Sequence, residues 1–172
     1  MSSTPDTVIS NTSPLLYLYQ VGQLNLLPKL YGTVIAPDAV NQEPSVGQKT
    51  GVDVPDLSRL DWLQIQAISS PPTIPNVIDL GRGEAEVIAL GLTNTNSLLI
   101  LDDQLGRRIA KLYKLRYTGT LGVLIKAKQT GYVETIAPII TQLQHQGMWL
   151  AETVIQAALN LAGESGKNNA NP

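Results

Sequence analysis

The sequence predicts an α/β fold, in which helices cover both faces of a parallel sheet. Two observations support this prediction. Short runs of aliphatic residues alternate along the chain with longer segments whose apolar residues recur at helical spacing. One of these runs, Ser97–Leu101, contains four consecutive aliphatic residues, as expected for a strand buried on both faces of a sheet. The chain has no internal repeat, and its 172 residues suit one domain with a full core.

Five short runs predict the strands. Each combines aliphatic, aromatic or β-branched residues and is bounded by polar or turn-forming residues. In chain order the runs are Thr7–Ser10, Thr33–Ala36, Trp62–Ile68, Ser97–Leu101 and Arg116–Tyr117. Trp62–Ile68 alternates in part between apolar and polar residues, so we expect it at the sheet edge. The apolar Ser97–Leu101 is expected to be the central strand.

Proline positions and apolar spacing predict the first three helices. Pro14 suits the first position of a helix, and Thr12 or Ser13 would cap it. A second helical stretch, Gln23–Tyr31, is closed by the glycine that follows it. A short helix then spans Pro37–Glu43 and stops because a proline comes next.

Five further helices follow from apolar residues repeated at helical spacing. They are expected at Glu84–Leu92, Gln104–Leu115, Leu121–Gln129, Glu134–His145 and Trp149–Leu161. The second of them is amphipathic, and its predicted apolar face consists of Leu105, Ile109, Leu112 and Tyr113. The domain is expected to span residues 1–162, and the polar residues 163–172 are expected to form a disordered tail.

The composition excludes several classes of site. Because the chain has no cysteine, it forms no disulfide, thiolate metal site or thiol nucleophile. His145 is the sole histidine, which excludes a multi-histidine zinc site, and nothing near it in sequence suggests a Ser-His-Asp triad. The formal net charge is −2, so any binding of nucleic acid would depend on a local basic patch.

The apolar residues give no sign of a membrane segment. The first seven residues lack the apolar core of a signal peptide. No apolar run approaches the roughly 20 residues that span a bilayer. We therefore expect a cytoplasmic protein without a membrane partner.

Four segments carry acidic or amide side chains where predicted elements begin or end. They are Ser10–Pro14, Val40–Glu43, Gly83–Glu86 and Leu98–Asp103. In an open α/β sheet, sites form at the carboxyl ends of the strands. Asp102 and Asp103 directly follow an apolar strand, where two adjacent carboxylates repel each other and a divalent cation is the usual remedy.

Each of these residues also has a purely structural interpretation. Asn11 would cap the first helix, Glu43 would be a solvated charge, and Glu84 would favour a helix start through the dipole. Either Asp102 or Asp103 would cap the following helix. Taken together, however, these residues are expected at the same edge of the sheet, which favours a site. Oxygen ligands without histidine or cysteine select Mg²⁺ or Mn²⁺. Such a site suits hydrolysis of phosphodiester bonds.

A basic stretch follows the acidic pair. No acidic residue occurs between Asp103 and Glu134, and the stretch holds seven of the 12 Lys and Arg residues. The seven are Arg107, Arg108, Lys111, Lys114, Arg116, Lys126 and Lys128. A solvated helix face is the common explanation of such a run. The absence of any compensating acid favours a surface that faces an anion.

The ordered set of motifs resembles the PIN domain superfamily, and in particular a PIN-like subfamily of small prokaryotic proteins. The resembling segments are Val8–Leu16, Gly83–Leu90, Leu99–Asp103 with Arg107–Ala110, and Thr118–Leu124, which span most of the folded chain. The resemblance implies a three-layer α/β/α fold around a parallel sheet of about five strands. It also implies bound Mg²⁺ or Mn²⁺ and cleavage of single-stranded RNA. Many such proteins are toxins that are restrained by an antitoxin protein, and they commonly form homodimers.

The acidic positions of the family fall on Asn11, Glu43, Glu84 and Asp103, with Asp102 adjacent. The family usually has Asp where this chain has Asn11, and an amide oxygen can ligate a hard cation although it carries no formal charge. We therefore expect metal ligands at these five positions, with Asn11 as a ligand or a residue that positions water. The catalytic residues are expected to be Asn11, Glu84, Asp102 and Asp103.

Three functions remain open from the sequence. The leading hypothesis is a metal-dependent ribonuclease in which Arg107, Arg108 and Lys111 hold RNA phosphates. The second is a catalytically weak or inactive PIN-like module that binds RNA or a protein partner, because Asn11 replaces a carboxylate. A phosphotransfer receiver or phosphatase-like domain is less favoured, because its key aspartate usually follows an early strand and the first strand here ends at Asn11.

Overall fold

A parallel sheet of five strands forms the middle layer of the computed structural model, which describes residues 3–39, 53–68 and 80–164. The strands are β1 (Thr7–Ser10), β2 (Val34–Pro37), β3 (Leu63–Gln66), β4 (Ser97–Ile100) and β5 (Arg116–Thr118). Their order in the sheet is β3-β2-β1-β4-β5, and each neighbouring pair is parallel. The predicted fold class and the five strands are therefore confirmed, and β3 is an edge strand as expected.

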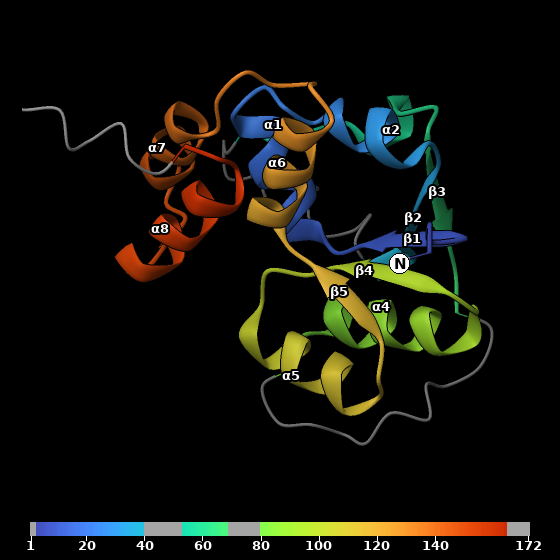
Figure 1. Cartoon of the computed structure of the whole chain (residues 1–172). Helices are drawn as coiled ribbons and strands as arrows, with labels where there is room; N and C mark the ends of the chain where they lie inside the picture. The colour runs from blue at the N-terminus through green and yellow to red at the C-terminus, as the bar shows by residue number, and fades with distance from the viewer. Residues whose placement is uncertain (1–2, 40–52, 69–79, 165–172) are drawn as a thin grey trace, which may run out of the picture.

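Helices cover both faces of this sheet. In the described residues they are α1 (Thr12–Gln20), α2 (Leu26–Tyr31), α4 (Arg82–Thr93), α5 (Gln104–Leu112), α6 (Thr120–Gln129), α7 (Ala137–His145) and α8 (Glu152–Leu161), with a short 3₁₀ helix at Leu57–Arg59. Figure 1 shows α4 and α5 on one face and the other α-helices on the opposite face. The result is the expected three-layer α/β/α arrangement.

Alternation along the strands builds two apolar cores. Val8 and Ile100 point into the larger core, which includes α1, α2, α6, α7 and α8. Ile9 and Leu99 point into the core beneath α4 and α5, and Leu101 joins them there. All five are buried, as the side-chain period of two predicts for a sheet covered on both faces.

Three helices begin later than predicted. The observed starts are Leu26, Ala137 and Glu152, where Gln23, Glu134 and Trp149 were expected. A glycine with positive φ lies shortly before each start: Gly22 at 71°, Gly131 at 85° and Gly147 at 97°. Non-helical residues follow each of these glycines before the next helix begins, and apolar spacing does not indicate where they end.

Two large apolar side chains, Leu112 and Trp149, are exposed to solvent. Leu105, Ile109 and Tyr113 pack into the core beneath α4 and α5 as expected, but Leu112 is 79% exposed because α5 ends there. Trp149 is 81% exposed, since it precedes α8 and does not lie on its packed face. Both leave large apolar surface in contact with water.

The strand order places the carboxyl ends of β1 and β4 side by side. β1, and not β4, is the middle strand, so the prediction that Ser97–Leu101 is central was wrong by one position in the sheet. The chain adds β2 and β3 on one side of β1, and then adds β4 and β5 on its other side. In the β1–β4 pair, Thr7 lies opposite Ser97 and Ser10 lies opposite Ile100. The backbone N–H of Asn11 then donates to the carbonyl of Ile100 at 3.1 Å. Such a switch point is where parallel sheets form their sites.

Some predicted features lie outside the described residues. The helix predicted to reach Glu43 is described only as far as Ala39, so Glu43 itself is not placed. Residues 165–172 of the predicted tail are also outside the described part. No helix in the described part of the chain is long and apolar enough to cross a membrane.

Candidate active site

Asn11 is held at the end of β1 by a contact with a distant residue. It occupies the N-cap position of α1, yet its side chain makes no capping hydrogen bond. Its Nδ2 donates instead to Oε1 of Glu84 at 2.8 Å. The residue is only 2% exposed, and its Oδ1 has no hydrogen-bond partner among the described residues. The capping interpretation of Asn11 is therefore wrong, and so is the predicted cap at Thr12 or Ser13, which lie inside the helix.

Glu84 reaches Asn11 because the start of α4 leaves room for its carboxylate. Glu84 lies in the first turn, where the helix dipole stabilises a negative charge. A Cβ atom on Gly81, the N-cap residue, would lie 2.2 Å from Oε2 of Glu84. Glycine at this position therefore permits the carboxylate to fold back over the helix end.

Asp103 approaches the same place from β4. It is the N-cap residue of α5, and its carboxylate accepts from the backbone N–H of Gly106 at 2.7 Å. A Cβ on Gly106 would lie 3.5 Å from Oδ2 of Asp103 and 3.6 Å from Cγ of Glu84. Gly106 therefore lies close to both acidic side chains, and Glu84 in turn contacts Asn11. We call these three residues, which come from three separate segments, the row of Asn11, Glu84 and Asp103.

Asp102 has a different environment from its neighbour. Its Oδ1 accepts from the backbone N–H of Thr120 at 2.8 Å, and its Oδ2 accepts from Oγ1 of Thr120 at 2.6 Å. Nη2 of Arg107 lies 4.0 Å from Oδ1, while Nε of Arg107 donates to the carbonyl of Leu101 at 2.7 Å. Of the two adjacent acids, Asp103 caps α5 and Asp102 joins the turn after β4 to the start of α6.

Gly119 makes this second arrangement possible. A Cβ atom there would lie 1.9 Å from Nη2 of Arg107 and 2.6 Å from Oδ1 of Asp102. The backbone of Gly119 is extended, at φ −135°, so the requirement for glycine comes from the close approach alone. The Asp102–Arg107 pair therefore packs directly against the chain before α6.

The oxygen atoms that Asn11, Glu84 and Asp103 offer as ligands suit a hard cation. A buried acceptor without a partner costs about 1–3 kcal/mol, and Oδ1 of Asn11 is such an atom beside a carboxylate. Amide and carboxylate oxygens are the ligands that Mg²⁺ and Mn²⁺ prefer. Within the described residues, no group of three or more His, Cys, Asp or Glu side chains could hold a metal ion. The fit therefore depends on the amide of Asn11 together with two carboxylates.

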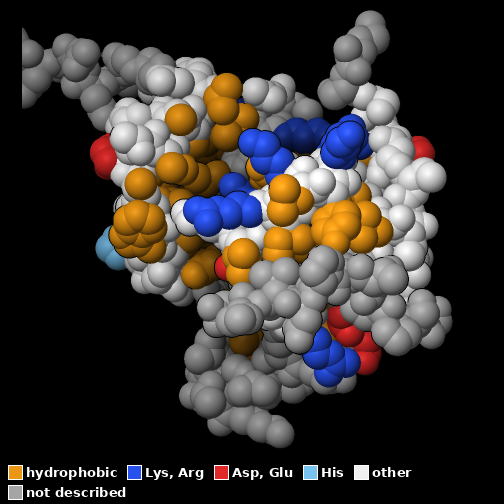
Figure 2. Space-filling view, turned by 90° about the horizontal axis from the view of Figure 1, so that it is seen from below, with side chains coloured by type: hydrophobic (Ala, Val, Ile, Leu, Met, Phe, Trp, Pro, Cys, Tyr) orange, Lys and Arg blue, Asp and Glu red, His pale blue; other side chains and the backbone are white. Residues whose placement is uncertain are grey.

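The predicted phosphate-binding residues divide into two kinds. Arg107 lies against the protein, with its guanidinium 5.6 Å from the ring centre of Tyr117. Arg108 and Lys111 are exposed on α5 and form no ion pair with any described residue. Figure 2 shows Lys and Arg side chains gathered on one face of the molecule, next to hydrophobic side chains.

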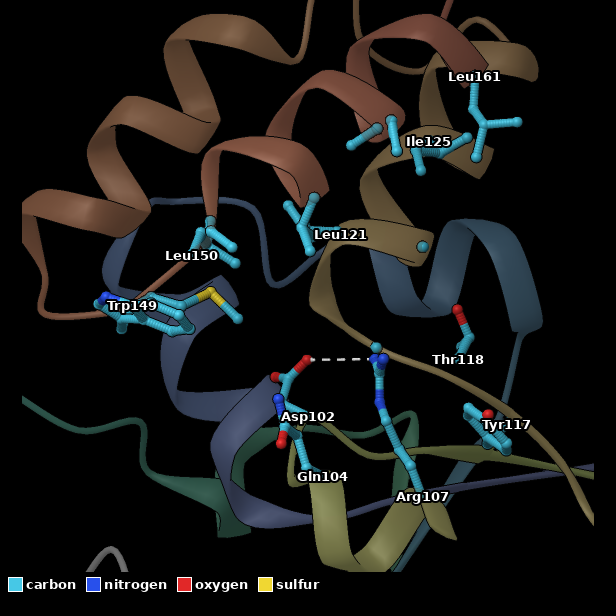
Figure 3. A pocket seen from close by; sticks show the side chains of 17 residues that line it. Asp102, Gln104, Arg107, Tyr117, Thr118, Leu121, Ile125, Trp149, Leu150 and Leu161 are labelled. Atoms are coloured by element: carbon cyan, nitrogen blue, oxygen red, sulfur yellow. Dashed lines mark ion pairs between the residues drawn. The ribbon is translucent and has the colours of Figure 1, made fainter. Parts of the chain in front are cut away.

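A pocket that no sequence pattern indicated adjoins the site. Its volume is about 540 Å³, and it lies between the turn after β4, β5, α6 and α8. Asp102 and Arg107 form part of its wall, as Figure 3 shows, and most of the remaining lining is apolar. Trp149 contributes to the lining although it was predicted to lie within a helix. The exposed position of Trp149 would have indicated this pocket, but the exposure of a side chain cannot be read from the sequence.

Comparison with known proteins identified one family. A family model described as a PIN domain matches residues 7–164, which is most of the chain and includes every described element from β1 to α8. Searches of curated proteins and of solved structures found no match.

Proposed function

The chain belongs to the PIN domain family, and on that premise we propose that it is a metal-dependent ribonuclease that hydrolyses phosphodiester bonds of RNA. One observation carries the proposal: Oδ1 of Asn11 is buried without a partner in the described residues while Nδ2 holds Glu84. The asparagine thus keeps one oxygen available at the position where the family usually has a carboxylate.

Mg²⁺ or Mn²⁺ would be held by Asn11, Glu84 and Asp103, and we include Glu43 as a further ligand. When bound, the ion would activate a water molecule and stabilise negative charge on the phosphate oxygens. The hydrogen bonds of the chain orient two of these ligands before any ion arrives: Asn11 holds Glu84 at 2.8 Å, and the N–H of Gly106 holds Asp103 at 2.7 Å. Ligands fixed in this way lose little conformational freedom on binding.

Asp102 takes a positioning role in this proposal. Because Thr120 occupies both of its oxygens, Asp102 fixes the turn that carries Asp103 relative to α6. Arg108 and Lys111, exposed on α5 just after Asp103, would attract and hold the RNA phosphates. Arg107 would contribute through the part of its guanidinium that faces the pocket.

The test is cleavage of single-stranded RNA by purified protein with Mn²⁺ or Mg²⁺, compared with the same reaction in EDTA. Glu84→Gln and Asp103→Asn each remove one negative charge and should abolish cleavage. Glu152→Gln is the matched control, since Glu152 is an exposed acid at the start of α8. Equal cleavage by all four proteins would point to a contaminating nuclease and contradict the proposal.

The proposal extends to a biological role as a toxin restrained by an antitoxin partner, and to a homodimer. Expression of the wild-type chain should then arrest growth, while expression of Asp103→Asn should not. Co-expression of the protein encoded next to this gene should restore growth if that protein is the antitoxin. Growth arrest by both forms would contradict a toxin that acts by cleavage.

A second function is favoured by the same pair of residues. Asn11 carries no charge, and its donation to Glu84 satisfies one carboxylate oxygen without any metal. The chain would then be a catalytically weak or inactive PIN module that binds RNA or a protein. Titration calorimetry separates the two functions, because absence of binding at millimolar Mn²⁺ would favour this second one.

A further inference from the structure

We propose that the pocket beside Asp102 binds unpaired bases of single-stranded RNA, with Trp149 and Tyr117 as stacking surfaces. The choice of RNA rests on the proposed function, whereas the choice of bases rests on the pocket itself. The pocket lies outside the row of Asn11, Glu84 and Asp103, since none of these three residues lines it. It would therefore contribute to binding and to the choice of cleavage site, and not to the chemistry.

The lining combines many apolar side chains with a few polar ones. Among the apolar residues are Leu121, Ile125, Leu150, Val154 and Leu161, of which the last two are exposed. Asp102, Gln104, Arg107 and Thr118 supply polar groups near one end. A volume of about 540 Å³ with a mostly apolar lining and a few polar groups is typical of sites for small organic ligands. Nucleobases match this description, because they have flat apolar faces and polar edges.

Two aromatic side chains border the pocket with exposed surface. Trp149 is 81% exposed and Tyr117 is 38% exposed. Figure 3 shows them on either side of the Asp102–Arg107 pair. The guanidinium of Arg107 lies 5.6 Å from the ring centre of Tyr117. Exposed aromatic faces beside a cationic surface are the usual means by which proteins hold single-stranded nucleic acid.

The charge distribution favours a polyanion over a protein segment. Arg108 and Lys111 are exposed on α5, the helix that also supplies Arg107 to the pocket wall. The single carboxylate in the lining, Asp102, is already bonded to Thr120 and lies near Arg107. A polyanion would therefore meet the exposed cations Arg108 and Lys111, and a single carboxylate, Asp102, that is already hydrogen-bonded. An apolar peptide would leave both cations without a partner.

The pocket and the acidic row share a short piece of chain. Asp102 lines the pocket, and the next residue, Asp103, belongs to the row with Glu84. A base bound in the pocket would therefore bring a neighbouring phosphate toward the acidic row. This arrangement would make the bases beside the cleaved bond determinants of specificity.

The two tryptophans allow a direct test, since the chain contains only Trp62 and Trp149. In Trp62→Phe the sole tryptophan is Trp149, and in Trp149→Phe it is Trp62, so excitation that is selective for tryptophan reports on one position at a time. Each protein is titrated, in EDTA to prevent cleavage, with a single-stranded RNA of about ten nucleotides. An abasic strand of the same length and charge, and the corresponding RNA duplex, are titrated in the same way as controls without unpaired bases.

We expect the RNA strand to quench Trp149 fluorescence in Trp62→Phe, and the abasic strand and the duplex to quench it far less. Trp62 fluorescence in Trp149→Phe should change little. Trp149→Ala should weaken RNA binding by about five- to hundredfold, the effect of losing one stacked base. Leu112→Ala, which truncates an exposed apolar side chain on α5, should leave the affinity unchanged.

Three results would overturn the inference. The first is equal quenching by the abasic strand, which would mean that phosphates alone are bound. The second is unchanged affinity in Trp149→Ala with a native circular dichroism spectrum. The third is a wild-type dimer that Trp149→Ala converts to a monomer in sedimentation, which would make the pocket a subunit contact. Quenching by RNA without any cleavage in Mn²⁺ would instead contradict only the proposed ribonuclease function.

Discussion

Nδ2 of Asn11 donates to Oε1 of Glu84 at 2.8 Å, and this bond joins two residues that are 73 positions apart in the sequence. The amide replaces a repulsion that two carboxylates would create at this distance. It also leaves Oδ1 buried without a partner among the described residues. The uncharged residue therefore stabilises the arrangement with Glu84 and leaves one amide oxygen without a partner in the described part of the chain.

Asn11→Asp should exchange stability for metal affinity. The variant loses the Nδ2 donor and places a second carboxylate beside Glu84, so we expect the free energy of unfolding in EDTA to fall by about 1–3 kcal/mol. Mn²⁺ should then raise the melting temperature more in the variant than in the wild type, because binding to the folded state stabilises it. Asn160→Asp, at an exposed asparagine in α8, is the control. An identical Mn²⁺ response in wild type and Asn11→Asp would contradict this role.

Thr120→Val should destabilise the protein through Asp102. The substitution keeps the backbone N–H but removes the Oγ1 donor that lies 2.6 Å from Oδ2. A hydrogen bond to a charged group contributes about 1.5–3 kcal/mol, and we expect a loss of that size in urea unfolding. Thr120→Ser retains the hydroxyl and should lose much less. Equal losses for the two variants would show that the methyl group, and not the hydroxyl, is what matters.

Gly119→Ala should disturb the same contact by displacement. The new Cβ would fall 1.9 Å from Nη2 of Arg107 and 2.6 Å from Oδ1 of Asp102, so one of these groups must move. We expect a lower melting temperature and weaker binding of single-stranded RNA. The comparison is Gly122→Ala in α6, where the new Cβ would lie equally close, 2.0 Å from Oγ1 of Thr118, but near neither charged group. A melting temperature for Gly119→Ala as high as that for Gly122→Ala would be inconsistent with the proposed packing.

Neutralising the exposed cations of α5 should change the salt dependence of RNA binding. The double variant Arg108→Gln/Lys111→Gln removes two predicted phosphate contacts. The slope of log K against log salt concentration should become less negative by about 1.4, at about 0.7 for each contact with a single strand. Lys29→Gln/Arg59→Gln removes the same charge from α2 and the 3₁₀ helix and should leave the slope unchanged. Identical slopes for the two double variants would place the RNA elsewhere.

Local patterns in the sequence were sufficient for the fold, and they drew attention to several candidate site residues. Short runs rich in aliphatic and β-branched residues correctly predicted β1, β2 and β4, because a strand covered on both faces is mostly apolar. The rule that sites form at strand ends brought Asn11 and Asp103 into consideration, and both lie at such ends. Glu84 lies in the first turn of its helix, as the sequence predicted. The resemblance to PIN domains, based on ordered motifs, was confirmed by the family model.

Only the tertiary structure decided which atoms these residues contact. Asp102 and Asp103 are adjacent in sequence, yet one binds Thr120 and the other caps α5, since an extended backbone directs successive side chains differently. The pocket is lined by residues of β5, α6 and α8 that are distant in sequence, and by Trp149, which lies just before α8. Contacts between distant segments depend on the packing of whole layers. Sequence patterns record which face of an element is apolar, but not which neighbour that face will meet.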